Sequence, residues 1–123
     1  MSKKILVVDD DEAIQEVIKT CLEDLAGWQV LLAGSGLEGL RIANSEALDA
    51  ILLDISMPKM NGIEMLRKLQ ENDSTRKIPV FLLTARTVSA DRQQLEQVAG
   101  VIIKPFNIIK LVEQVSQSLG KRL

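Results

Sequence analysis

Short apolar runs alternate with amphipathic stretches along the whole chain. The runs are partly β-branched and lack polar alternation, which predicts strands buried on both faces of a sheet. The predicted strands are Ile5–Val8, Val30–Ala33, Ala50–Leu53, Val80–Leu83 and Val101–Ile103. Between them, apolar residues recur at the spacing of one helix face. The predicted helices are Glu12–Leu25, Leu37–Ala47, Ile63–Gln70, Ser89–Val98 and Ile108–Leu119, of which the fourth has the fewest apolar positions.

Five strands alternating with five helices predict an α/β fold, in which a parallel sheet is covered by helices on both faces. A length of 123 residues suits a single domain over residues 1–123. In open sheets of this class, ligands bind where the strands end at their carboxyl side. We therefore expect the functional residues directly after the predicted strands.

Composition excludes several functions. The net charge is −2, so no basic surface indicates direct binding to nucleic acid. One Trp, two Phe and no Tyr are too few for base-stacking platforms. The absence of histidine excludes a His-based catalytic or zinc site. The N-terminal apolar run is too short for a signal peptide or a membrane span, so we expect a cytoplasmic protein without membrane contact.

The single cysteine, Cys21, has no partner for an internal disulfide. It falls within the apolar stripe of the first predicted helix. That stripe consists of Ile14, Val17, Ile18, Cys21, Leu22 and Leu25. Cys21 is therefore predicted to be a small core residue.

Four consecutive acids, Asp9 to Glu12, follow the first predicted strand. Acids favour a helix N-terminus, and capping explains Asp11 and Glu12 well. Asp9 and Asp10 lie at the strand end and require another explanation. A hard cation such as Mg²⁺, which takes one or two carboxylates and keeps water ligands, is the natural candidate. On this segment alone, capping and metal binding are equally supported.

Asp54 closes the third apolar run, and the third predicted helix begins too far downstream for Asp54 to cap it. With Asp9 and Asp10 it would form a set of three carboxylates at one edge of the sheet. Thr84 follows the fourth run and Lys104 the fifth. A threonine or a lysine at a strand end is commonplace, but a lysine beside three acids is a suitable phosphate partner.

Residues 34–39 spell G-x-G-x-x-G between a predicted strand and a predicted helix, as a dinucleotide-binding turn would. Ser35 and Glu38 also form an S-x-x-E capping box, which explains the segment by local helix chemistry. Glu38 would oppose a pyrophosphate at this helix start. The chain is also too short for the two halves of a complete dinucleotide-binding domain. The capping interpretation is preferred.

Jointly, these residues resemble the receiver domain of bacterial two-component response regulators, over essentially the whole chain. The motifs that carry the resemblance are Ile5–Asp11, Asp54 with Met57–Gly62, Thr84-Ala85 and Lys104-Pro105-Phe106. The resemblance implies a flavodoxin-like, doubly wound five-stranded parallel sheet of order 2-1-3-4-5.

The resemblance also implies a chemistry. Asp54 would accept a phosphoryl group from a phosphohistidine of a sensor histidine kinase or a phosphotransfer protein. Asp10 and Asp54 would bind Mg²⁺ together with the backbone carbonyl of Ser56, and Asp9 would assist through water.

Two further residues acquire roles by resemblance, and one departs from the family pattern. Lys104 would pair with a phosphoryl oxygen, and the Thr84 hydroxyl would move to bind another. The switch position that usually holds Tyr or Phe is Val101 here. Either a smaller movement of the fourth helix and its loop carries the signal, or the output is weakly switched. The surface of helix 4, strand 5 and helix 5 would bind the downstream target or a second copy of the chain.

Two alternatives belong to other functional classes. A haloacid-dehalogenase-type phosphatase also uses a nucleophilic Asp with Mg²⁺, but it requires D-x-D-x-T after the first strand, and Ala13 stands where the hydroxyl belongs. The other alternative is a receiver-like scaffold that is never phosphorylated. It stays open because Val101 replaces the aromatic switch residue of the family. We expect a signalling module that catalyses at most its own phosphorylation and dephosphorylation.

Overall fold

A computed structural model describes residues 3–54, 62–84, 98–103 and 107–120. The strands are β1 (Lys4–Val8), β2 (Gln29–Ala33), β3 (Ala50–Asp54), β4 (Val80–Thr84) and β5 (Gly100–Ile103). The helices are α1 (Glu12–Cys21), the π-helix η1 (Leu22–Ala26), α2 (Gly36–Ser45), α3 (Gly62–Glu71) and α5 (Ile108–Gly120). All five predicted strands are therefore present, and β3 and β4 each extend by one residue to include Asp54 and Thr84.

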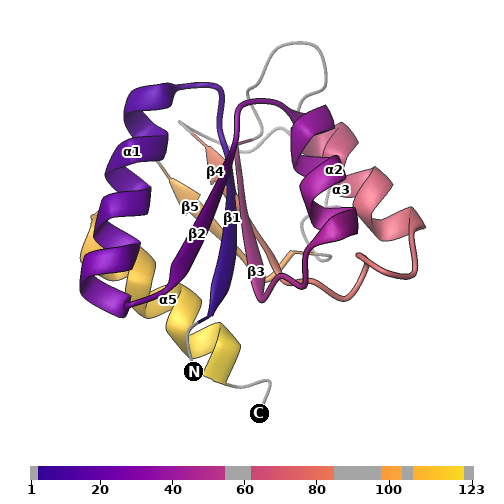
Figure 1. Cartoon of the computed structure of the whole chain (residues 1–123). Helices are drawn as coiled ribbons and strands as arrows, with labels where there is room; N and C mark the ends of the chain where they lie inside the picture. Colours follow the sequence, from indigo (N-terminus) through magenta and orange to yellow (C-terminus); the bar gives the residue numbers. More distant parts are fainter. Residues whose placement is uncertain (1–2, 55–61, 85–97, 104–106, 121–123) are drawn as a thin grey trace.

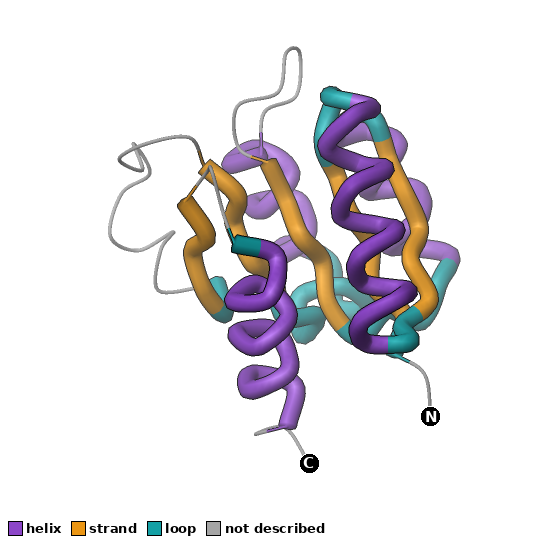
Figure 2. The backbone as a smooth tube through the Cα atoms, turned by 90° about the vertical axis from the view of Figure 1, so that its left-hand side faces the viewer, coloured by secondary structure: helices purple, strands orange, loops and turns teal. Residues whose placement is uncertain are grey.

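The five strands form one sheet of order β2-β1-β3-β4-β5, and all neighbouring strands are parallel. The predicted flavodoxin-like order is confirmed. Helices α1 and α5 cover one face of the sheet, and α2 and α3 cover the other (Figure 1). The view turned by 90° shows α1 and α5 in front of the strands (Figure 2).

Two hydrophobic cores lie on the two faces of the sheet, because successive strand residues point in opposite directions. Ile5 and Val7 of β1 belong to the first core, which includes residues of α1 and α5. Leu6 and Val8 belong to the second core, which includes residues of α2 and α3. In β3 every residue is buried, as predicted for a strand covered on both sides. Strand β2 is less buried than predicted because it lies at the edge.

The predicted helix caps are largely confirmed. The Asp11 carboxylate accepts hydrogen bonds from the N–H groups of Ala13 and Ile14 at the start of α1. The Ser35 hydroxyl accepts from the Glu38 N–H at 3.1 Å. The Glu38 carboxylate reaches back to the N–H of Gly34, one residue before the usual partner in a capping box.

The predicted apolar stripe of the first helix is partly wrong. Val17 and Leu25 are 56% and 57% exposed, and Cys21 is only half-buried. The buried positions are Gln15, Ile18 and Leu22. Val17 lies about 200° around the helix from Gln15 at 3.6 residues per turn. The wider π turn of η1 then rotates Leu25 away from the core.

The helix predicted at Ser89–Val98 falls largely on residues 85–97, which lie outside the described residues. Its last residue, Val98, belongs to a bend before β5 and packs against the second core. In the described part of the chain, no helix combines the length and apolarity that a membrane crossing requires. The predicted cytoplasmic location stays a prediction.

Candidate functional site

Asp9 and Asp54 are placed side by side by the register of two central strands. Val8, the last residue of β1, pairs with Leu53 of β3, so the next residue along each strand is an aspartate. Both side chains are buried, Asp9 completely and Asp54 with 5% exposure. Two carboxylates thus meet at the carboxyl edge of the sheet, where ligands bind in open α/β folds.

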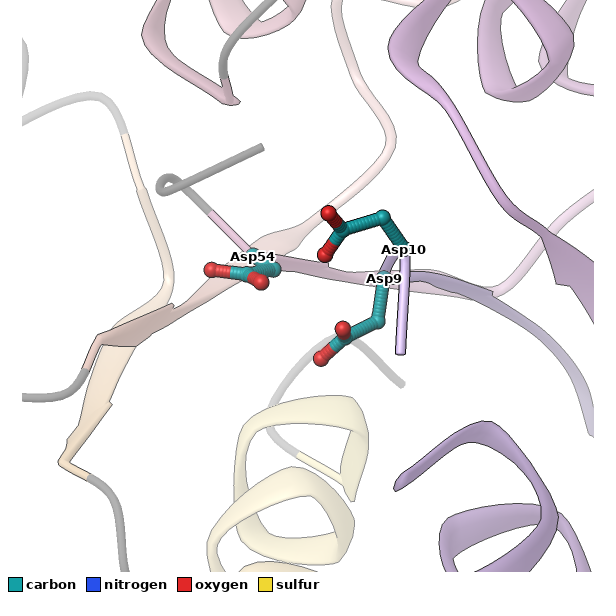
Figure 3. A group of neighbouring side chains, drawn as sticks. All are labelled: Asp9, Asp10 and Asp54. Atoms are coloured by element: carbon teal, nitrogen blue, oxygen red, sulfur yellow. The ribbon is translucent and has the colours of Figure 1, made fainter. Parts of the chain in front are cut away.

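Asp10 completes a cluster of three carboxylates. One carboxylate oxygen from each of Asp9, Asp10 and Asp54 lies within 4.8 Å of the others, and Asp10 is exposed. Figure 3 shows that Asp9 and Asp10 leave consecutive positions in opposite directions at the end of β1, with Asp54 beside them. The structure therefore brings together the three acids that the sequence predicted.

Hydrogen bonds hold the turn that follows β1. The Asp9 N–H donates to the Ala33 carbonyl at 3.1 Å, which extends the pairing of β1 with β2. The Asp11 N–H donates to Asp9 Oδ1 at 2.9 Å. Asp11 in turn caps α1, so its role is structural, as predicted. The chain is thereby fixed on both sides of Asp10.

Gln15 is a residue near this site that sequence reasoning missed. It is 9% exposed, and its side-chain amide donates to the main-chain carbonyls of Asp9 and Ala33. A signal was present in the sequence: Gln15 precedes Ile18 by three positions and Leu22 by seven, on the same face of the helix. The apolar residues Ile14 and Val17 predicted a different buried face of this helix.

The remaining predicted site residues are placed only in part. Thr84 is the last residue of β4, one position beyond Leu83, which pairs with Asp54. Val101 lies in β5, where it pairs with Leu82, is half-buried and packs against the second core. Ser56 and Lys104 lie outside the described residues.

The glycine-rich motif at residues 34–39 is accounted for by packing and capping. A Cβ built on Gly39 would lie 2.8 Å from Met65 Cε and 2.9 Å from Val8 Cγ2, so α2 approaches β1 and α3 too closely for a side chain. Glu38 and Ser35 form the capping interactions described above. Local structure therefore explains this motif without a bound dinucleotide.

The chain is similar to known signalling proteins over nearly its whole length. Residues 5–116 match the response regulator receiver domain family. The chain is 30% identical over 122 residues to the polar-differentiation response regulator DivK of Brucella ovis, with 98% of each chain covered.

Solved structures show the same likeness. The receiver domain of the Francisella response regulator 1452 superposes with a TM-score of 0.88 at 30% identity, covering 99% of this chain and 100% of that one. The receiver domain of sensor histidine kinase PA1611 from Pseudomonas aeruginosa PAO1 has a TM-score of 0.87 at 30% identity, covering 98% and 99%. That structure has a magnesium ion coordinated in its active-site cleft.

The fold and the family match together define the class of protein: the chain belongs to the response regulator receiver domain family. It is a response regulator receiver domain of the two-component type, a family of signalling domains. Receiver domains bind Mg²⁺ at an acidic site, and such a cluster is present here in Asp9, Asp10 and Asp54. Family membership favours the signalling module over the phosphatase alternative.

Proposed function

We propose that Asp54 accepts a phosphoryl group from a phosphohistidine, with Mg²⁺ bound beside it, and that the resulting charge changes the surface the domain offers to a partner. The observation that carries this proposal is the convergence of the Asp9, Asp10 and Asp54 carboxylates within 4.8 Å of one another at the carboxyl edge of the sheet. We assign residues 1–123 to one receiver domain.

The donor set fits Mg²⁺. All three ligand candidates are carboxylates, and hard oxygen donors are the ligands that Mg²⁺ takes in proteins. Asp10 and Asp54 would bind the ion directly together with the backbone carbonyl of Ser56, and Asp9 would act through water. When bound, Mg²⁺ supplies positive charge that offsets the charge on the equatorial phosphoryl oxygens.

The nucleophile of the phosphoryl transfer is the Asp54 carboxylate. An oxygen of Asp54 attacks phosphorus, the N–P bond of the phosphohistidine breaks, and the imidazole leaves with the bonding electron pair and takes up a proton from solvent. An acyl phosphate then remains on Asp54. The three carboxylates repel the incoming phosphoryl group, so the reaction depends on cationic groups at the site.

Lys104 and Thr84 have the remaining roles in the proposal. Lys104 pairs with one phosphoryl oxygen, and the Thr84 hydroxyl moves to bind another. Support for these roles comes from their sequence positions: Lys104 follows β5, and Thr84 ends β4 next to β3.

The response to phosphorylation cannot use an aromatic side chain at the switch position. Val101 has no ring, and its half-buried side chain packs against the second core. We propose that a smaller movement of the segment after β4 carries the signal. The partners would be a sensor histidine kinase or phosphotransfer protein, and a downstream target or a second copy of the chain bound at the face formed by helix 4, strand 5 and helix 5.

The test uses acetyl phosphate, a small phosphodonor, with and without Mg²⁺, and intact-protein mass as the readout. The parent protein should gain about 80 Da, one phosphoryl group, only when Mg²⁺ is present. Asp54→Asn should gain nothing. Asp11→Asn is the matched control: it makes the same change two residues from Asp9, and asparagine caps a helix as well as aspartate does. It should retain the adduct.

Other outcomes identify the alternatives. Steady release of phosphate from generic substrates without any adduct would indicate a phosphatase. Neither adduct nor turnover in the parent protein would indicate a scaffold that works without phosphorylation. An adduct that survives in Asp54→Asn would move the acceptor to another residue.

A further inference from the structure

Gln15 ties helix α1 to the ends of two strands. Its Nε2 donates to the main-chain carbonyl of Asp9 at the end of β1, and at 3.2 Å to that of Ala33 at the end of β2. The side chain is 9% exposed, so a lost donor here would not be replaced freely by water. A single buried amide thus links three elements at the edge that carries the acidic cluster.

Both carbonyls belong to the main chain that positions the acids. The Ala33 carbonyl also accepts the Asp9 N–H at 3.1 Å. The backbone N–H of Gln15 donates to the Asp11 carbonyl at 3.0 Å. Gln15 therefore holds the residue before Asp10 through its side chain and the residue after Asp10 through its main chain.

The Asp9 carbonyl is part of the peptide group that joins Asp9 to Asp10. Because a peptide group is planar, fixing the direction of this carbonyl also fixes where the chain enters Asp10. Asp10 is the exposed member of the cluster, while Asp9 and Asp54 are buried. The bond from Gln15 is thus a constraint on the acid that packing restrains least.

We propose that Gln15 is a positioning residue for Mg²⁺ binding: its amide orients the Asp9–Asp10 peptide so that Asp10 and Asp54 bind one ion directly and Asp9 binds it through water. Mg²⁺ demands near-ideal octahedral geometry, so small errors in ligand placement weaken binding. The inference rests on the proposed function, since it concerns the metal that assists phosphorylation of Asp54.

A purely structural role is the competing explanation, and Thr75 provides the control for it. Thr75 is 2% exposed, and its hydroxyl also donates to two main-chain carbonyls, those of Leu69 at 2.8 Å and Asn72 at 3.3 Å. It lies after α3 and before β4, at the end of the sheet opposite the acidic cluster. Loss of the Thr75 donor should lower the free energy of unfolding without changing a hydrogen bond of the turn after β1.

The experiment compares Gln15→Met, which keeps the length of the side chain but removes both donors, with Thr75→Val. Urea unfolding followed by the fluorescence of Trp28, the single tryptophan, reports stability. Titration calorimetry with Mg²⁺ alone reports affinity, and the rate of adduct formation from acetyl phosphate reports phosphorylation.

We expect both variants to lose stability. Gln15→Met should weaken Mg²⁺ binding about 10- to 100-fold, as losses of outer-shell partners do, and Thr75→Val should bind Mg²⁺ like the parent.

A folded Gln15→Met with the Mg²⁺ affinity and phosphorylation rate of the parent would overturn the inference. So would an equal loss of affinity in Thr75→Val, because the effect would then follow stability. If Gln15→Met does not fold, Gln15→Asn decides: its amide is one methylene shorter, and parent-like Mg²⁺ affinity would overturn the inference equally. A parent protein that binds no Mg²⁺ and forms no adduct would overturn the proposed function itself, and this inference with it.

Discussion

Gly39 of α2 lies directly against Val8 of β1, with no room for a side chain between them. A Cβ added to Gly39 would come within 2.9 Å of Val8 Cγ2 and 2.8 Å of Met65 Cε. Val8 is the residue before Asp9, so the packing of α2 on the sheet is set one residue away from the acidic cluster.

Gly39→Ala should therefore destabilise the protein. Alanine normally stabilises a helix relative to glycine, but here its methyl group displaces Val8, a stiff β-branched side chain, or Met65. We expect a loss of about 1–3 kcal/mol in the free energy of unfolding, typical of overpacking. Urea unfolding followed by Trp28 fluorescence measures it. Gly34→Ala is the control: the nearest atom to its Cβ is 3.8 Å away, so its stability should equal or slightly exceed that of the parent. A Gly39→Ala variant as stable as the parent would contradict the close approach.

Mg²⁺ should stabilise the folded protein through the three-carboxylate cluster. A ligand that binds only the folded state at a hundred times its Kd adds about 2.7 kcal/mol. Asp10→Asn should lose most of this increment, because it removes the exposed carboxylate of the cluster. Asp11→Asn should retain it. Unfolding in urea with Mg²⁺ and with chelator measures the increment for each variant. Equal increments in all three proteins would place the ion elsewhere.

The corrected orientation of α1 predicts opposite outcomes for two neighbouring apolar residues. Ile18 is completely buried in the first core, while Val17 is 56% exposed. Ile18→Ala should cost about 2–5 kcal/mol, as buried truncations do. Val17→Ala should change stability by less than about 0.5 kcal/mol. Thermal and urea unfolding of the pair check this, and similar losses in both variants would restore the orientation expected from the apolar stripe.

The N-terminus of α5 depends on Asn107. Its side-chain oxygen accepts from the N–H groups of Ile109 at 2.9 Å and Lys110 at 3.3 Å. Asn107→Ala should cost about 1 kcal/mol, the usual value of such a cap. Asn107→Asp keeps the acceptor and should remain close to the parent. Chemical denaturation distinguishes the two; a loss in Asn107→Asp equal to that in Asn107→Ala would mean that the amide donor of Asn107, not its oxygen, matters.

The strands and the helix caps could be predicted from the sequence because they depend on nearby residues. Hydrophobic runs mark strands buried on both faces, and the Asp11 and Ser35 side chains each accept hydrogen bonds from N–H groups two or three residues away. The order of the strands did not follow from these patterns. The hydrophobic runs predict burial on both faces for every strand and therefore do not distinguish one position in the sheet from another. It came from the resemblance to receiver domains.

The candidate site was predicted in part for a similar reason. Parallel strands end at the same edge, so acids after the first and third strands could be expected to meet if those strands were neighbours. In the structure β1 and β3 are neighbours, and their register places Asp9 beside Asp54. Thr84 was predicted at the same edge and ends β4, but its role, like those of Ser56 and Lys104, stays a prediction.

The sequence alone determined the five strands, the α-helices of the described residues, the caps of α1 and α2 and the acids that follow β1 and end β3, because each of these follows from neighbours along the chain. The tertiary structure decided which face of α1 is buried and what Gln15 does there. A buried glutamine amide needs hydrogen-bond acceptors. Here the acceptors are the main-chain carbonyls of Asp9 and Ala33, and Ala33 is 18 positions away from Gln15 in the sequence. The spacing of Gln15, Ile18 and Leu22 indicates a shared helix face, but no local pattern identifies the two carbonyls, because they meet the amide only when β1, β2 and α1 are packed together.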